Sequence, residues 1–273
     1  MTYNKNIFLC TADNRYTHKG SDHRVDLCIE SFKHLKKKNC NINLGFIGQS
    51  DVDIDIDIPV YKTLNRDSKS IIDGDKRYPF MNDILNCACD LSSDIFVVCN
   101  SDIIVSQKLI DVINITTVEA FGVTRTEILP INSIYDVATI IRNEPAGFDC
   151  WVVSKQWWIQ YQQLFCDMII GQPHFDVLYT LLMLMNSKNH YISNNNYLFH
   201  IAHPRQWSTN GSEYSKYNQK QSTKYANFEP FWKELGDNTF WKRRDPGKFL
   251  QVSDKEIDVI NEIKCARKGC LDI

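Results

Sequence analysis

Short apolar runs alternate with amphipathic stretches over the first 200 residues of the chain. Residues 6–12 and 41–48 are apolar runs of the length that buried parallel strands have. Between them, residues 21–38 repeat apolar positions every three or four residues and end in three lysines, as an amphipathic helix does. The chain therefore opens as strand, helix, strand, which predicts a parallel α/β sheet.

The alternation of predicted strands and helices continues to about residue 203. Residues 51–60 alternate Asp with apolar residues, which predicts an edge strand with one wet face. The remaining pattern predicts strands over residues 94–100, 119–129, 147–154 and within 190–203, and helices over residues 78–92, 107–116, 155–165 and 173–188.

The character of the chain changes after Pro204. Residues 205–273 are polar, basic in places and rich in Tyr, Phe and Trp, with no clear strand pattern. We expect an α/β domain over residues 1–204 and a partly helical extension over 205–273 that packs on it. The aromatic residues leave other partners open: an acceptor glycan, single-stranded nucleic acid, a membrane face or a second copy of the chain.

Composition narrows the class of protein. The 273 residues are 43% hydrophobic and 23% charged, and the net charge of −2 disfavours nucleic acid as a partner, although a balanced total still permits local patches. The ten cysteines include no CxxC spacing, which argues against a zinc ribbon. The first residues lack a signal-peptide pattern, and no apolar run is long enough to span a bilayer, so we expect a reduced, cytoplasmic protein.

The polar triplet Asn100-Ser101-Asp102 directly follows the apolar run 95–99. In an open α/β sheet, ligands bind beyond the carboxyl ends of the strands. A carboxylate at Asp102 could hold a divalent cation that bridges two phosphates, and Asn100 could bond a ribose or sugar hydroxyl. The structural alternative is an Asx-type turn in which both side chains bond their own backbone.

Four stretches carry a resemblance to a known family. They are RYPFMNDILNCACDLSSDIFVVCNSDIIV, GFDCWVVSKQWW, IIGQPHFDVLYTLLM and YLFHIAHPRQW, which occur in this order between residues 77 and 207. Together they resemble the bacterial and viral glycosyltransferase-like proteins of the GT-A type, and Asn100-Ser101-Asp102 resembles a variant of the DxD motif of that family.

The resemblance implies a Rossmann-like GT-A sheet, mixed but mostly parallel and flanked by helices, that binds a nucleotide-diphosphate sugar through Mn²⁺ or Mg²⁺. Asp102 matches the metal-binding acid, and Asn100 stands where the motif has its first acid, which suits a sugar or ribose contact. Asp83 would touch the nucleotide or fix the nearby loop, with a helix-dipole role as the structural alternative.

Further site residues follow from the later stretches. Asp149 would face the sugar or acceptor, and Asp176, kept ionised at a helix N-terminus, would activate the acceptor or place a charge opposite the sugar. The structural alternatives are a strand-entry carboxylate bonded to backbone for Asp149 and a helix N-terminal cap for Asp176. Either His200 or His203 would complete the metal shell. Arg125 could pair with a phosphate or with a site carboxylate, and Arg15 could contact a base or a phosphate, although a surface ion pair is the more ordinary role for each.

These features favour a metal-dependent glycosyltransferase that moves a sugar to a glycan or another hydroxyl acceptor. A non-catalytic protein that binds sugar nucleotides or glycans is the main alternative, because Asn100 departs from the motif. A transferase that glycosylates nucleic acid is a further alternative. A nucleotidyltransferase is disfavoured, since the segment after the first strand carries only Gly20 where a glycine-rich phosphate loop is needed.

Overall fold

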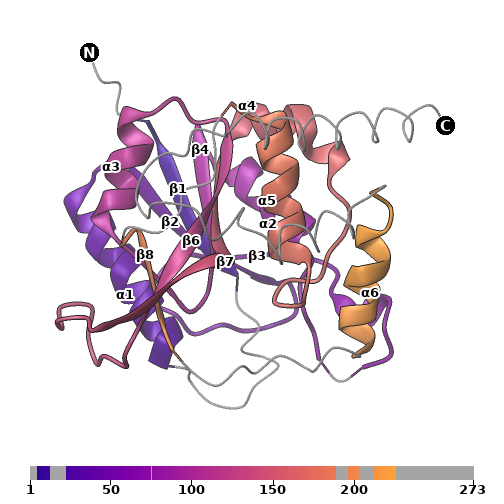
Figure 1. Cartoon of the computed structure of the whole chain (residues 1–273), viewed down its shortest axis with the longest axis horizontal. Helices are drawn as coiled ribbons and strands as arrows, with labels where there is room; N and C mark the ends of the chain where they lie inside the picture. The colour runs from indigo at the N-terminus through magenta and orange to yellow at the C-terminus, as the bar shows by residue number, and fades with distance from the viewer. Residues whose placement is uncertain (1–4, 13–22, 75, 189–195, 203–211, 226–273) are drawn as a thin grey trace.

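The centre of the molecule is one sheet with the strand order β3-β2-β1-β4-β7-β6-β8-β5 (Figure 1). The computed structural model describes residues 5–12, 23–74, 76–188, 196–202 and 212–225. Its strands are β1 (Ile7–Ala12), β2 (Ile42–Gln49), β3 (Val60–Leu64), β4 (Ile95–Asn100), β5 (Ile103–Val105), β6 (Ala120–Ile128), β7 (Ile140–Ser154) and β8 (Leu198–Ile201).

The sheet is mixed but mostly parallel, which confirms the predicted fold class. Strands β3, β2, β1 and β4 run parallel to one another, and β6 is parallel to β8. β7 is antiparallel to β4 and to β6, and β5 is antiparallel to β8. Because β4 and β6 point the same way, the carboxyl end of β4 and the second half of β6 lie on either side of β7, where Cys99 and Val123 both pair with Cys150.

Helices cover both faces of the sheet, because each strand is apolar on both sides. α1 (His23–Lys38) and α3 (Gln107–Ile115) share a core with one face. α2 (Met81–Leu91), α4 (Lys155–Tyr161) and α5 (Phe175–Asn186) share a core with the other face. Short 3₁₀ turns, η2 (Ser68–Ser70) and η3 (Gln162–Leu164), connect neighbouring elements.

A glycine sets how closely α5 approaches the sheet. A Cβ on Gly122 of β6 would lie 2.6 Å from Oγ1 of Thr180, so only glycine allows this contact without a shift. The same hydroxyl accepts a hydrogen bond of 3.2 Å from Nε1 of Trp151 on β7. Together these contacts fix α5 against β6 and β7 and hold its first turn near the edge of the sheet.

The described part of the C-terminal extension contains α6 (Glu213–Ser222). Its buried Asn218 accepts a hydrogen bond from the backbone N–H of Ile169 and donates one to the carbonyl of the same residue. Tyr214 and Tyr217 pack against Tyr78, Phe80 and Ile169. α6 therefore supports the segment that leads into α5, and the expectation that the extension is helical in part is confirmed for this helix.

Two local predictions were wrong. Residues 51–59 do not form a strand, and the edge strand begins only at Val60. The side chains still alternate as expected, because Ile54 and Ile56 pack on the core while Asp53 and Asp57 pair with lysines. In addition, residues 103–105 after the polar triplet form the short strand β5, which the pattern did not predict.

Candidate functional site

Predicted site residues from separate elements converge at the carboxyl edge of the sheet. Asn100 ends β4, and Asp102 lies in the turn between β4 and β5. Arg125 lies on β6, Asp149 in the second half of β7 and His200 on β8, where Glu127↔His200 and Ile103↔His200 are paired positions. We call this group, together with Arg24, Glu127 and Asp176, the edge cluster.

Asp149 is buried and held from two sides. Nδ2 of Asn100 donates a hydrogen bond of 2.6 Å to Oδ1 of Asp149, and the guanidinium of Arg125 donates to Oδ2. Asn100 and Asp149 follow and precede the paired residues Cys99 and Cys150, so the strand register itself brings them together. Both carboxylate oxygens of Asp149 thus have a protein donor.

Arg125 links Asp149 to a second acid, Glu127, whose Oε1 lies 3.3 Å from the guanidinium. Burial alone would lower the pKa of Arg125, but the charges of Asp149 and Glu127 outweigh it, so the pKa is raised above its usual value. The expectation of an ordinary surface ion pair was wrong for Arg125, because its side chain is only 17% exposed.

The network continues to Asp102 through His200. Nδ1 of His200 lies 3.7 Å from Oε1 of Glu127, and Nε2 lies 3.3 Å from Oδ2 of Asp102. Arg24, near the start of α1, brings a guanidinium to 4.0 Å from the same Asp102 oxygen. The edge cluster is therefore a connected chain of alternating acidic and basic groups.

Asp102 and His200 contact each other directly, and their shared binding of a divalent cation stays a prediction. Neighbouring ligand atoms on an octahedral Mg²⁺ lie about 3 Å apart, since each is about 2.1 Å from the metal. The Asp102 oxygen and His200 nitrogen have close to that separation. No group of three His, Cys, Asp or Glu side chains suited to a metal occurs among the described residues. Such a pair suits Mg²⁺ or Mn²⁺, which protein carboxylates commonly share with substrate phosphates and water.

Asp176 opens α5 and has an altered ionisation. The residue is partly exposed, yet its carboxyl group is densely surrounded by protein. Burial and then the nearby charge of Asp149 raise the pKa of Asp176 to about 7. Hydrogen bonds from the helix backbone lower the pKa of Asp176, but burial and Asp149 have the larger effect, and the predicted role of Asp176 stays a prediction.

The segment before Asp176 is held in a specific shape. Gly171 has φ of 70° and His174, the N-cap residue just before α5, has φ of 77°. A histidine in this left-handed region is uncommon, and such conformations persist where the surroundings fix them. Here the backbone N–H of Met81 donates to the carbonyl of Met168, and Asn218 binds Ile169. The position of the Asp176 carboxyl is therefore determined by α2 and α6 as well as by α5.

Asp83 lies apart from the edge cluster. It accepts two hydrogen bonds, of 2.7 and 2.8 Å, from Arg66 just after β3, and Arg66 also donates two to Asp167. Asp83 thus fixes a neighbouring loop, which is one of its two expected functional roles, and contact with a nucleotide stays a prediction.

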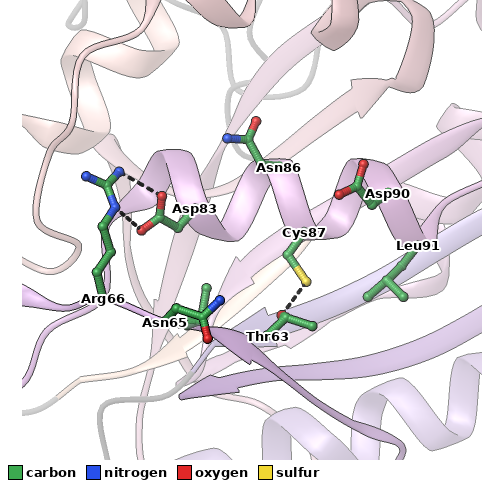
Figure 2. Close-up of a pocket in the computed structure, with 9 residues that line it drawn as sticks. Thr63, Asn65, Arg66, Asp83, Asn86, Cys87, Asp90 and Leu91 are labelled. Atoms are coloured by element: carbon green, nitrogen blue, oxygen red, sulfur yellow. Dashed lines mark hydrogen bonds and ion pairs between the residues drawn. The ribbon is translucent and has the colours of Figure 1, made fainter. Parts of the chain in front are cut away.

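Arg66 and Asp83 also line a pocket of about 390 Å³ beside α2 (Figure 2). Thr63 and Cys87 meet across it, with Asn86, Asp90 and Leu91 on the same helix. No residue of the edge cluster lines this pocket. The pocket is therefore a separate feature on the flank of α2.

The remaining predicted residues are less informative. Ser101 is partly buried in the turn beside Asp102. Arg15 and His203 lie outside the described residues. Sequence reasoning missed Arg24 and Glu127. Glu127 could have been found, because it lies two positions after Arg125 on a strand and so shares its face.

Within the described part of the chain, no helix is long and apolar enough to cross a membrane. Among the described residues the core contains free, buried cysteines, including Cys10 and Cys99. Burial raises the pKa of both thiols, so they behave as small apolar side chains.

No protein-family model matches the sequence, and no curated protein matches it. Among solved structures, the chain is similar to S. aureus TarS, with a TM-score of 0.41 and 8% identity over 72% of this chain and 37% of that one. It is similar to the inositol-1-phosphate CTP transferase from T. maritima (TM-score 0.39, 8% identity, 81% of this chain and 98% of that one). It is also similar to the apo form of the glycosyltransferase GlyE of Streptococcus pneumoniae TIGR4 (TM-score 0.36, 12% identity, 92% of this chain and 66% of that one). The chain spans 37% of TarS, and these distant similarities concern the fold alone.

Proposed function

We propose that the protein is a metal-dependent glycosyltransferase that moves a sugar from a nucleotide-diphosphate sugar to a hydroxyl acceptor at the edge cluster. The observation that carries this proposal is a pair of acids with opposite environments. Asp149 is bonded to Asn100 and Arg125, whereas the pKa of Asp176 is raised to about 7. Two neighbouring carboxyl groups whose environments push their pKa values apart are typical of active sites in which one group acts as an acid and the other as a base.

The basic groups suit the leaving diphosphate. Arg24 and Arg125 bring two positive charges to the carboxyl edge, where phosphates bind in open α/β sheets. Asp102 and His200 would hold a divalent cation, which would supply further positive charge opposite the departing phosphate oxygen. The Asn100 amide, bonded to Asp149, is suited to a sugar or ribose hydroxyl rather than to the cation.

Asp176 is the group suited to accept a proton. Both oxygens of Asp149 already accept protein hydrogen bonds, and Asp176 has a pKa near neutral pH, where a general base works best. In the proposed step, Asp176 takes the acceptor hydroxyl proton while the acceptor oxygen bonds to the anomeric carbon. The bond from that carbon to the diphosphate breaks, and its electron pair leaves with the diphosphate.

A thermal-shift panel tests the donor site. Nucleoside diphosphates and their common sugars would be added with and without Mn²⁺ to the wild type, to Asp102→Ala and to Asp90→Ala as a control on exposed α2 surface. We expect one nucleotide to raise the melting temperature only with Mn²⁺, in the wild type and the control but not in Asp102→Ala, since a ligand of the native state stabilises it.

No shift with any nucleotide in the presence of metal would contradict the proposal. A shift without turnover would favour the alternative of a non-catalytic protein that binds sugar nucleotides.

A further inference from the structure

The connection between β6 and β7 carries an unusual concentration of exposed apolar side chains. Of eight exposed large hydrophobic residues in the described part of the chain, five lie between positions 129 and 141. They are Leu129, Tyr135, Val137, Ile140 and Ile141, with Tyr135 and Val137 exposed by 69% and 92%. Exposed apolar side chains gathered on one segment in this way are characteristic of an interaction site.

The connection is fixed in place by apolar contacts and by hydrogen bonds. Ile131 and Ile134 pack against a small core that contains Leu27 of α1 and Ile128 of β6. The Asp136 carboxylate accepts hydrogen bonds of 2.8 and 3.0 Å from the N–H groups of Asn132 and Ser133. Part of the connection is thus anchored to the core while its remaining apolar side chains face outward.

Helix α1 lies alongside the connection and supplies positive charge. Nδ1 of His34 lies 3.1 Å from the Tyr135 hydroxyl, and Nε2 of His23 lies 3.1 Å from the carbonyl of Ile131. Figure 1 shows the connection projecting past the sheet on the side of α1. Lys37 and Lys38 are exposed, and they lie three and four residues after His34, on the same side of the helix.

The last turn of α1 is basic, although the chain as a whole is slightly acidic. α1 carries five Arg and Lys residues and two acids, Asp26 and Glu30. Lys33 is paired with Asp57, and Glu30 lies 3.4 Å from the Ser133 hydroxyl. Asp136 is occupied by backbone N–H groups. Lys37 and Lys38 therefore give the exposed end of α1 a local positive charge beside the apolar residues.

We propose that the connection and the adjoining side of α1 dock the protein on an anionic membrane surface. Tyr and aliphatic side chains on a projecting loop enter the headgroup region, and neighbouring lysines contact anionic headgroups. A second copy of the chain is a poorer occupant, because two identical cationic surfaces repel each other. The inference does not depend on the proposed reaction, but Arg125 and Glu127 lie on β6 directly before this surface, so docking would hold the edge cluster close to the bilayer.

Vesicle sedimentation with the full chain tests the inference. Vesicles of phosphatidylcholine alone would be compared with vesicles that also contain phosphatidylglycerol. We expect binding only to the anionic vesicles, with strong weakening by salt. Val137→Asp should lower the partition coefficient at least tenfold, and Lys37→Glu with Lys38→Glu should lower it by at least about 25-fold, since loss of each lysine alone costs about fivefold and each new glutamate is repelled in addition.

Matched controls come from elsewhere on the surface. Ile115→Asp changes an aliphatic residue of α3 that is 74% exposed, and Lys220→Glu changes an exposed lysine of α6. Both should bind vesicles within twofold of the wild type, and unchanged melting temperatures would show that all variants fold.

Absence of binding to anionic vesicles would overturn the inference, as would equal losses in Ile115→Asp and Val137→Asp. So would a wild-type dimer in sedimentation velocity that Val137→Asp dissociates without any vesicle binding, because that result would assign the surface to a second copy.

Discussion

Arg66 and Arg125 each bridge two carboxylates, but they do so in different surroundings. Arg66 binds Asp83 and Asp167 through four hydrogen bonds of 2.7 to 2.9 Å, and its side chain is 44% exposed. It joins the end of β3 to α2 and to the segment before α5. Arg125 binds Asp149 and Glu127 within the sheet, and its side chain is 17% exposed.

The two regions also differ in what lies around the bridge. The Arg66 bridge consists of one guanidinium and two carboxylates, and each carboxylate accepts two hydrogen bonds from Arg66. The Arg125 bridge continues to His200, Asp102 and Arg24, and it faces Asp176, whose pKa is raised to about 7. Exposed bridges of the first kind hold segments together, whereas a buried network with a perturbed carboxyl is characteristic of a functional site.

Removing the Arg125 charge should have the largest effect on stability. Arg125→Met would leave Asp149 and Glu127 buried without their cation, which we expect to lower the free energy of unfolding by about 3–5 kcal/mol. Urea unfolding at pH 7.5, with Arg125→Lys as the variant that retains charge, measures this loss. If Arg125→Met lowered the free energy of unfolding by less than about 1 kcal/mol, the network would contribute no more to stability than a surface ion pair does.

The Asp176 carboxyl should destabilise the fold above neutral pH. Its pKa is about 7 in the folded protein and about 3.9 in an unfolded chain, so the folded state binds the proton more tightly. The folded state therefore loses stability as pH rises from about 4 to 7, and the loss stays constant at higher pH.

Asp176→Asn removes this titration while it preserves the shape of the side chain. After allowance for its partial exposure, we expect the variant to unfold with about 1–3 kcal/mol more free energy than the wild type at pH 8. Urea unfolding between pH 4.5 and 8 should show this gain shrinking as pH falls. A gain that does not depend on pH would contradict the raised pKa.

The Arg66 bridge should be the least costly to remove. Arg66→Met eliminates an exposed ion-pair set and retains an apolar side chain over the Phe80 ring, whose centroid lies 4.7 Å from the guanidinium carbon. We expect a loss of about 1 kcal/mol or less, smaller still in 1 M salt. If thermal unfolding showed a loss as large as that of Arg125→Met, exposure would not be what separates the two bridges.

The sequence predicted those residues of the edge cluster that stand next to the end or the start of an apolar run. Asn100 and Asp102 stand where a buried run stops, and Asp149 precedes another apolar run, so strand order alone places them at one edge. Glu127 was missed because β6 is buried along nearly its whole length, including Thr124 and Thr126. Arg24 was missed because a basic residue near a helix start has no distinctive pattern.

Other features depend on tertiary contacts that periodicity does not contain. The pKa of Asp176 on α5 depends on the nearby charge of Asp149, which lies on β7. Residues 51–59 alternate like a strand, but they pair through side chains, with Asp53 bound to Lys62 and Asp57 to Lys33. Their alternation therefore indicates which side chains face the core, and it does not indicate backbone hydrogen bonds to a neighbouring strand.

The most direct test of the account is release of nucleoside diphosphate from a panel of sugar nucleotides with Mn²⁺, with simple glycosides as acceptors. We expect the wild type to release diphosphate from one donor, at a rate that rises with pH through about 7 as Asp176 ionises. Asp176→Asn should lose about 10²–10⁴-fold in kcat. A donor that stabilises the wild type without any release, or equal release by Asp176→Asn, would contradict a glycosyltransferase in which the edge cluster performs the reaction.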